Sequence, residues 1–268
     1  MTMKPTTIAL AAGATVAGAA VGVAAWMRHQ AAAALPAPTP NLALSVPGFT
    51  VRERITGGVD PAQSLPLVLV LHGIGGSEEQ LMPFTNIKAP ARFVYVRGPV
   101  SDGAGPTAGY SYFKARFNTA GFMAEVEAMA LQILRVLDTV ASQRAISRTM
   151  LLGYSQGGHV AWMLAGSGRF DLVIPVSGAL VAGYRQPPPT GRTKIEALHG
   201  ADDRTLPATA GAATYRAFAN AGYRGAFSRV RAGHSLTTIG KFIAPTLTGA
   251  LETKPTRVGV ASTQVRGR

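Results

Sequence analysis

The sequence predicts an α/β fold, with a mostly parallel central sheet covered by helices on both faces. Three observations support this. Segments with strand character alternate with helical segments from residue 51 to residue 251. Residues 67–71 form an unbroken apolar run, which is typical of a strand buried on both faces. Apolar residues in 121–140 recur every three or four positions, as on one face of an amphipathic helix.

Each expected strand is a short apolar or alternating run bounded by glycine, proline or polar residues, and each expected helix has apolar residues at helical spacing. The first half of the body contains strands at 51–55, 67–71 and 93–96, a helix around 78–84, a long loop at 100–118 and the helix 121–140. The second half contains strands at 149–152, 172–176, 194–198 and 226–230, with helices from the turn 153–157 through 164, at about 208–221 and at about 239–251.

The two ends of the chain differ from this body. Residues 8–27 are uncharged and rich in Ala, Gly and Val, and they lie between Lys4 and Arg28. This pattern is typical of an export signal, while its length also suits an uncleaved membrane anchor. The expected divisions are 1–34 as signal peptide or N-terminal membrane anchor, 35–48 as a Pro/Ala-rich linker, 49–252 as the folded domain and 253–268 as a basic, disordered tail. We therefore expect an exported protein, periplasmic or secreted, or one associated with a membrane through residues 8–27; a third reading, in which the segment is neither signal nor anchor, stays open.

Composition excludes several classes of function. The 268-residue chain has no cysteine, which excludes a disulfide scaffold, a Cys-ligated metal site and a cysteine nucleophile. Its formal net charge is +13, but the basic residues are scattered, with no run of five or more. A nucleic-acid-binding protein requires a clustered basic surface, so we expect no nucleic-acid partner.

One turn carries a chemical motif. Gly153-x-Ser155-x-Gly157 lies between an apolar strand and an apolar-faced helix, which is the setting of a nucleophile elbow. Small residues two positions either side of the serine let strand and helix approach, and the new helix directs its N-terminus at a developing oxyanion. The alternative interpretation is a glycine-rich turn in which Ser155 only caps the helix.

A serine nucleophile needs a base and a carboxylate that orients the base, and in this kind of fold the chain order is serine, acid, histidine. Three histidines follow Ser155, and of these His159 lies on the helix directly after the turn, which leaves His199 and His234 farther along the chain. His234 follows the last strand and leaves room for Asp202 or Asp203 on a preceding loop, so it is the predicted base, with one of these aspartates as its partner. The other histidines receive structural interpretations: His29 flanks the apolar segment, His72 and His199 end strands and bond loop backbone, and His159 packs on its helix or faces solvent.

An oxyanion formed during acyl transfer needs two preorganised N–H donors. We expect one from Gln156, directly after the nucleophile, and the other from the glycine-rich segment 72–76, where the main chain can approach a substrate carbonyl. A phosphate-binding loop is the competing interpretation of 72–76, but no Gly-Lys-Ser/Thr sequence follows it.

Five segments appear in a characteristic order: LHGIG at 71–75, GYSQGG at 153–158, PVSG at 175–178, HGADDRTLP at 199–207 and GHS at 233–235. Together they resemble the phospholipase/carboxylesterase branch of the α/β-hydrolases, which includes acyl-protein thioesterases, and the resemblance covers about residues 65–250. The segment YSYF at 110–113 is similar to the aromatic substrate loop of that branch.

The resemblance implies an α/β-hydrolase fold and selects Asp203 over Asp202, because the acid of the family stands four residues after the histidine of His-Gly and four before proline. The site residues that it implies are Ser155 as nucleophile, Asp203 as acid, His234 as base, the backbone N–H groups of Ile74 and Gln156 as oxyanion hole, and Tyr112 and Phe113 as substrate-binding residues.

The predicted activity is that of a serine hydrolase that cleaves carboxylic esters through an acyl-enzyme. Its substrate would be a small-molecule or lipid-like ester, and no metal or organic cofactor is needed. Two alternatives remain: an acyl thioesterase or lysophospholipase with the same triad, and a non-catalytic binding domain anchored in the cell envelope.

Overall fold

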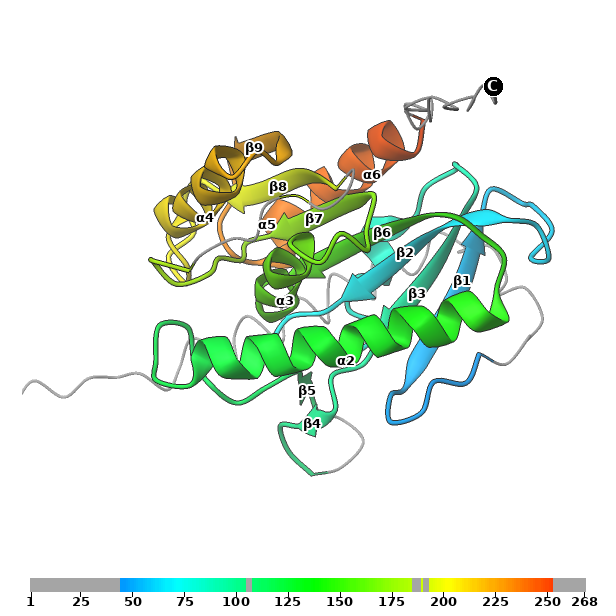
Figure 1. Cartoon of the computed structure of the whole chain (residues 1–268), viewed down its shortest axis with the longest axis horizontal. Coiled ribbons are helices and arrows are strands. Elements are labelled where there is room, and N and C mark those ends of the chain that lie inside the picture. The colour runs from blue at the N-terminus through cyan, green and yellow to red at the C-terminus, as the bar shows by residue number, and fades with distance from the viewer. Residues whose placement is uncertain (1–43, 105–107, 185–188, 190–192, 253–268) are drawn as a thin grey trace, which may run out of the picture.

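A computed structural model describes residues 44–104, 108–184, 189 and 193–252 of the chain. Within this part, seven strands form one sheet in the order β1-β3-β2-β6-β7-β8-β9 (Figure 1). Only β1 runs antiparallel to its neighbour, so the expected α/β class with a mostly parallel sheet is confirmed. The strands are β1 (Val51–Thr56), β2 (Leu65–Leu71), β3 (Ala91–Val96), β6 (Ile146–Tyr154), β7 (Leu172–Val176), β8 (Lys194–Gly200) and β9 (Arg224–Val230).

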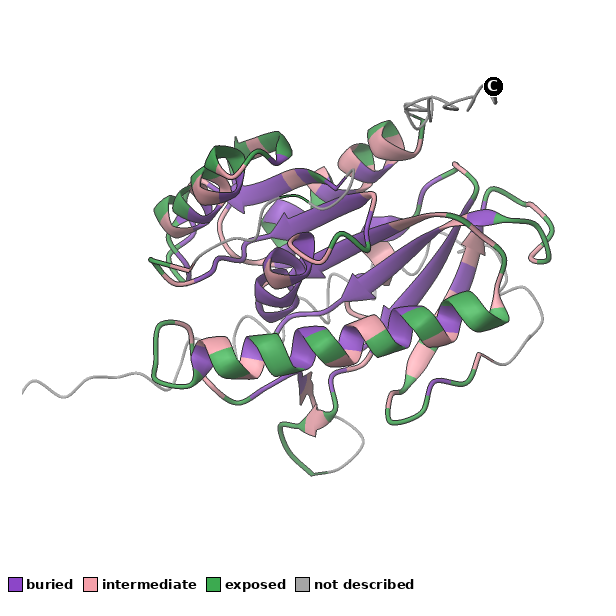
Figure 2. Cartoon of the chain, viewed as in Figure 1, coloured by how far each residue is buried: buried purple, intermediate pink, exposed green. Residues whose placement is uncertain are grey.

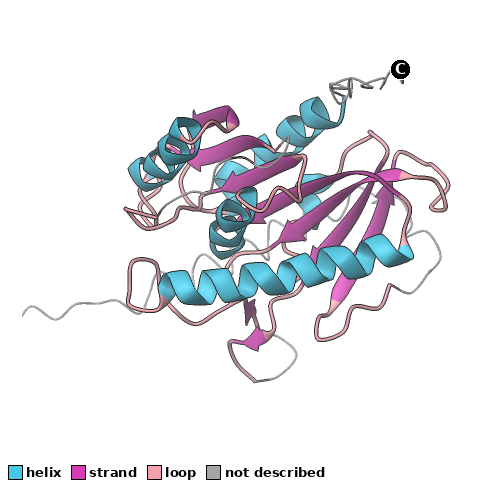
Figure 3. Cartoon of the chain, in the orientation of Figure 1, coloured by secondary structure: helices cyan, strands magenta, loops and turns pink. Residues whose placement is uncertain are grey.

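Helices cover both faces of this sheet (Figure 3). One face carries α2 (Phe122–Gln143), α3 (Gln156–Ala165) and α4 (Ala208–Asn220). The other carries the 3-10 helices η1 (Met82–Thr85) and η2 (Gly240–Phe242) with α5 (Leu236–Ile239) and α6 (Ile243–Glu252). No helix among the described residues is both long enough and apolar enough to cross a bilayer. The predicted signal or anchor, most of the linker and the predicted disordered tail lie outside the described residues.

The apolar run of β2 shows why helices must pack on both faces of the sheet. Side chains alternate between the faces of a strand. Leu67, Leu69 and Leu71 accordingly pack in the core beneath α2 and α3, while Val68 and Val70 pack in the core beneath α6. All five are buried, as Figure 2 shows along the central strands. A continuous apolar strand therefore places the carboxyl ends of β2 and its neighbours at one edge of a fully covered sheet.

Two regions differ from the sequence expectations. The helix expected around 78–84 is only the short η1, because Pro83 lacks an N–H and disfavours helical backbone at the residue before it. The long loop at 100–118 contains a small antiparallel pair, β4 (Val100–Ser101) with β5 (Tyr110–Ser111). The C-terminal helix begins earlier than expected and is divided into α5, η2 and α6 near Gly240, where any Cβ would lie 2.3 Å from the Phe84 ring.

Candidate active site

Ser155 lies on a strained turn between the end of β6 and the start of α3. Its φ of 52° and ψ of −110° are values that L residues rarely adopt. Two backbone hydrogen bonds hold the turn: the Ser155 N–H donates to the Val176 oxygen over 2.8 Å, and the Ser155 oxygen accepts from the His159 N–H over 3.0 Å. The turn therefore presents the serine side chain at the carboxyl edge of the sheet, beside the N-terminus of α3.

The glycines of the elbow are needed because strand and helix touch. A Cβ at Gly153 would lie 2.1 Å from the Gly157 oxygen, and a Cβ at Gly157 would lie 2.6 Å from the Leu71 oxygen. These neighbours are backbone atoms of packed elements, so they cannot rotate away as a flexible side chain would. The motif thus fixes the close approach of β2, β6 and α3.

We expect Gly157→Ala to lower the free energy of unfolding by about 1–3 kcal/mol, because the added methyl group overpacks the contact with β2. Urea denaturation monitored by circular dichroism measures the change. Gly249→Ala is the matched control, since a Cβ at this exposed position in α6 meets nothing within 4 Å. A Gly157→Ala protein as stable as the control would contradict the packing argument.

The structure brings the three expected side chains into one hydrogen-bonded row. The Ser155 Oγ lies 2.9 Å from the His234 Nε2, and the His234 Nδ1 lies 2.7 Å from the Asp203 Oδ2. A carboxylate oxygen only accepts, so the Nδ1 carries the proton and the Nε2 remains free to accept from the serine hydroxyl. Of the two candidate aspartates, only Asp203 joins the row, while Asp202 is exposed.

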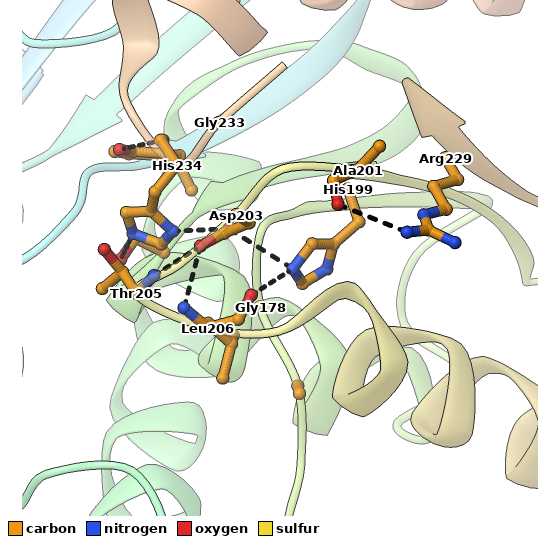
Figure 4. A network of polar contacts seen from close by, with 12 residues as sticks. Gly178, His199, Ala201, Asp203, Thr205, Leu206, Arg229, Gly233 and His234 are labelled. Atoms are coloured by element: carbon orange, nitrogen blue, oxygen red, sulfur yellow. Dashed lines mark hydrogen bonds and ion pairs between the residues drawn. The ribbon is translucent and has the colours of Figure 1, made fainter. Parts of the chain in front are cut away.

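The side chain of Asp203 is fully buried and surrounded by donors (Figure 4). Its Oδ1 accepts from the backbone N–H groups of Thr205 and Leu206, over 3.0 and 2.8 Å. Burial alone would raise the pKa of this carboxyl, but hydrogen bonds from His199, His234 and the Leu206 N–H outweigh it and hold the pKa below the ordinary value. The carboxylate therefore stays ionised beside the imidazole ring of His234.

The two expected oxyanion donors are free N–H groups. In the segment 73–76, three of the four N–H groups are used: Gly73 donates to the Gln80 Oε1, Gly75 to the Asp102 Oδ2 and Gly76 to the Gly73 oxygen. Among the described residues, the N–H groups of Ile74 and Gln156 have no acceptor. Gln156 directly follows the serine and begins α3, while Ile74 belongs to the segment after β2, in which a Cβ at Gly73 would lie 3.3 Å from the Ser155 Cβ.

Tyr112 and Phe113, which the resemblance implies as substrate-binding residues, lie in the core beside Gln156. Both side chains are buried in the core, and the Tyr112 hydroxyl donates to the Val96 oxygen and accepts from the His72 N–H. Their backbone instead clamps Gln156: its Oε1 accepts from the Tyr112 N–H over 2.7 Å, and its Nε2 donates to the Phe113 oxygen over 2.8 Å. In this structure the pair supports the residue after the serine.

His72 and His159 have structural settings, as expected, whereas His29 lies outside the described residues. Burial lowers the pKa of His72 to about 4, and its ring accepts from the Gly98 N–H and donates to the Gly73 oxygen. Burial likewise lowers the pKa of His159 to about 4, where the ring stacks on Phe117. The described residues contain no group of three metal-ligating side chains.

Some supporting residues escape sequence reasoning. Gln80 and Asp102 hold the oxyanion segment through the bonds given above, yet neither belongs to a recognisable motif. His199 bonds the Leu206 oxygen, as its structural interpretation implies, but its Nε2 also lies 3.4 Å from the Asp203 Oδ2. The four-residue spacing between His199 and Asp203 is the only sequence signal of that contact.

Comparisons with known proteins identify the family and the fold of the chain. The model of the phospholipase/carboxylesterase family matches residues 52–243. No curated protein matches the chain. Three similar solved structures are a carboxylesterase from Mesorhizobium loti (TM-score 0.62, 19% identity, 78% of this chain and 98% of that chain), the Bacillus cereus carboxylesterase (0.61, 18%, 75% and 94%) and esterase PE8 (0.61, 19%, 76% and 99%).

At these identities the solved structures show the fold, which is the expected α/β-hydrolase fold. The family match spans most of the described domain, including the elbow and the histidine after β9. The resemblance in the sequence is thereby confirmed: the chain belongs to the phospholipase/carboxylesterase family of α/β-hydrolases.

Proposed function

We propose that this protein is a serine hydrolase that cleaves carboxylic esters through an acyl-enzyme intermediate. In this proposal Ser155 is the nucleophile, His234 the general base and then acid, and Asp203 the group that orients and stabilises the imidazole. Membership of a family of carboxylesterase-type hydrolases supports the reaction class. The observation that carries the proposal is the row from the Ser155 Oγ through His234 to Asp203, with spacings of 2.9 and 2.7 Å.

The proposed reaction follows from this row. The Ser155 Oγ attacks the carbonyl carbon of the ester while its proton moves to the His234 Nε2. The tetrahedral oxyanion accepts hydrogen bonds from the free N–H groups of Ile74 and Gln156. The bond to the alcohol oxygen then breaks, and the His234 proton passes to the leaving group. Water deprotonated by His234 attacks the acyl group on Ser155, which releases the acid and restores the serine.

The test combines active-site labelling with a substrate series. A fluorophosphonate should label the Ser155 peptide of the folded protein, as mass spectrometry would detect, and p-nitrophenyl esters of increasing acyl length should be hydrolysed. Oxoesters should be cleaved with higher kcat/KM than thioesters of the same acyl group. A folded protein that neither takes the label nor hydrolyses any ester would overturn the proposal and favour a binding domain.

The same series separates the rival substrates. A preference for long acyl thioesters of about tenfold or more in kcat/KM, which corresponds to about 1.4 kcal/mol of transition-state binding, would replace ester hydrolysis by thioester hydrolysis. Release of fatty acid from lysophosphatidylcholine vesicles, faster than from short p-nitrophenyl esters, would instead identify a lysophospholipase.

A further inference from the structure

His199 contacts the carboxylate of the proposed triad from the side opposite His234. It is the penultimate residue of β8 and is 1% exposed. Its Nε2 lies 2.9 Å from the Leu206 oxygen and 3.4 Å from the Asp203 Oδ2. Both partners are acceptors, so the Nε2 must carry the proton and donate to them. Figure 4 shows Asp203 between the two imidazole rings.

We infer that His199 is a positioning residue for the proposed hydrolysis. Its Nε2–H holds the Asp203 carboxylate in place on its loop, so that the carboxylate keeps the His234 imidazole directed at Ser155. This inference rests on the proposed function. The shared acceptor is the decisive contact, because the Asp203 Oδ2 bonds the His234 Nδ1 over 2.7 Å. The Thr205 and Leu206 N–H groups hold only the Oδ1, so without His199 the Oδ2 would keep His234 as its one partner among the described residues and could shift, turning the imidazole away from Ser155.

A second observation shows that the His199 ring is fixed from its other edge. A Cβ at Gly211, on α4, would lie 2.4 Å from the His199 Nδ1. Only glycine therefore leaves room for the ring at this position of the helix. The Phe227 ring of β9 packs at a centroid distance of 6.2 Å from the imidazole. Contacts from α4 and β9 thus hold the imidazole with its Nε2 toward Asp203.

Electrostatics give the same contact a second consequence. The Nε2–H of His199 partly neutralises the Asp203 carboxylate, which reduces the attraction that this carboxylate exerts on a protonated His234. Other titratable or charged groups around the pair include Asp202 and Arg204 on either side of Asp203, Tyr154 on β6, His159 on α3 and Arg229 on β9, whose guanidinium donates to the Ala201 oxygen. Loss of the His199 donor should therefore stabilise protonated His234 and move the acid limb of kcat/KM to higher pH.

Two variants separate the effect of the His199 N–H donor from the effect of the volume that its side chain fills. His199→Met fills a similar volume without a donor, whereas His199→Gln retains a terminal N–H at a similar reach. With a p-nitrophenyl ester, His199→Met should lower kcat about 10- to 100-fold at little change in KM, and should move the acid limb upward by about half a pH unit. His199→Gln should recover most of kcat and the wild-type limb. Fluorophosphonate titration normalises each rate to folded sites.

Two outcomes would overturn the inference: a His199→Met protein with wild-type kcat and pH profile, or a His199→Gln protein as impaired as the methionine variant. If His199→Met does not fold, Gly211→Ala replaces it, because the added methyl group displaces the ring while its donor remains. Wild-type kcat in folded Gly211→Ala would equally contradict a positioning role.

A substrate-free measurement separates this inference from the proposed function. Histidine ¹⁵N NMR titration follows the pKa of His234 in each folded variant without any ester. A wild-type protein without hydrolysis would overturn the proposed function, whereas a His234 titration unaffected by His199→Met would overturn the role of His199 alone. An upward shift of the His234 pKa in His199→Met, reversed in His199→Gln, is the result we expect.

Discussion

Replacing Ser155 with alanine is expected to lower kcat for p-nitrophenyl butyrate by about 10⁴-fold or more, while KM changes far less. Alanine removes the Oγ that lies 2.9 Å from the His234 Nε2, so no acyl-enzyme can form. The free N–H groups of Ile74 and Gln156 remain and should leave a small residual rate through the oxyanion they bind. Initial rates across substrate concentrations measure both parameters.

Ser167→Ala is the matched control for this variant. Ser167 follows the same helix, α3, at its other end, and its hydroxyl donates to the Leu164 oxygen and accepts from the Arg169 N–H, neither of which belongs to the row. This control should retain wild-type kcat and fluorophosphonate labelling, whereas Ser155→Ala should lose both. Hydrolysis by Ser155→Ala within tenfold of the wild-type rate would remove the serine from the mechanism, since a triad member cannot contribute so little.

The elbow and the final histidine could be predicted from the sequence because local chemistry defines them. A Cβ at position 153 or 157 would lie 2.1 or 2.6 Å from a backbone oxygen, so both positions must be glycine for the strand and the helix to pack this closely. His234 could be chosen because it is the histidine after the last strand and has Asp202 or Asp203 on a loop before it, as the order serine, acid, histidine requires. The strands were placed well where they are buried on both faces, because such runs are continuously apolar.

The acid of the row is harder to predict from the sequence, because Asp202 and Asp203 are neighbours with the same chemistry. Spacing within the resembling family selected Asp203, and the structure shows the physical difference: its side chain is buried among N–H donors, while Asp202 is exposed. Such an environment depends on the backbone path of one loop, which no periodicity encodes. For the same reason, the contact between His199 and the Asp203 carboxylate cannot be predicted from the sequence.

The aromatic segment 110–113 illustrates a different limit. Its composition suits a substrate loop, but Tyr112 uses both capacities of its hydroxyl within the core. Propensity and composition cannot distinguish an aromatic side chain that lines a pocket from one that packs beneath it, since both settings favour large apolar surface. Only the positions of Val96 and His72, distant in the sequence, decide which setting applies.

Asp203→Asn is expected to lower kcat about 10⁴-fold, close to the loss in Ser155→Ala. An amide can donate a hydrogen bond from its NH₂ group to the His234 Nδ1, and the Nδ1 then accepts instead of donating. The proton moves to the Nε2, which can no longer accept from the Ser155 hydroxyl. The variant changes one atom of a side chain that is otherwise the same size, so the loss would report the tautomer rather than packing. Steady-state kinetics at neutral pH measure it.

Asp202→Asn is the control, because the exposed neighbour lies outside the row. It should keep wild-type kcat; a comparable loss in both variants would point to the charge of the loop instead of the hydrogen bond to His234.

Stability offers an independent check with a defined sign. The pKa of Asp203 is lower in the folded protein than in the unfolded chain, so its ionised form stabilises the fold above the ordinary aspartate pKa. The deficit of Asp203→Asn in urea denaturation should therefore be largest near neutral pH and shrink as the pH falls below about 4, the ordinary aspartate range. A deficit independent of pH would show that the carboxylate charge contributes nothing to holding this loop.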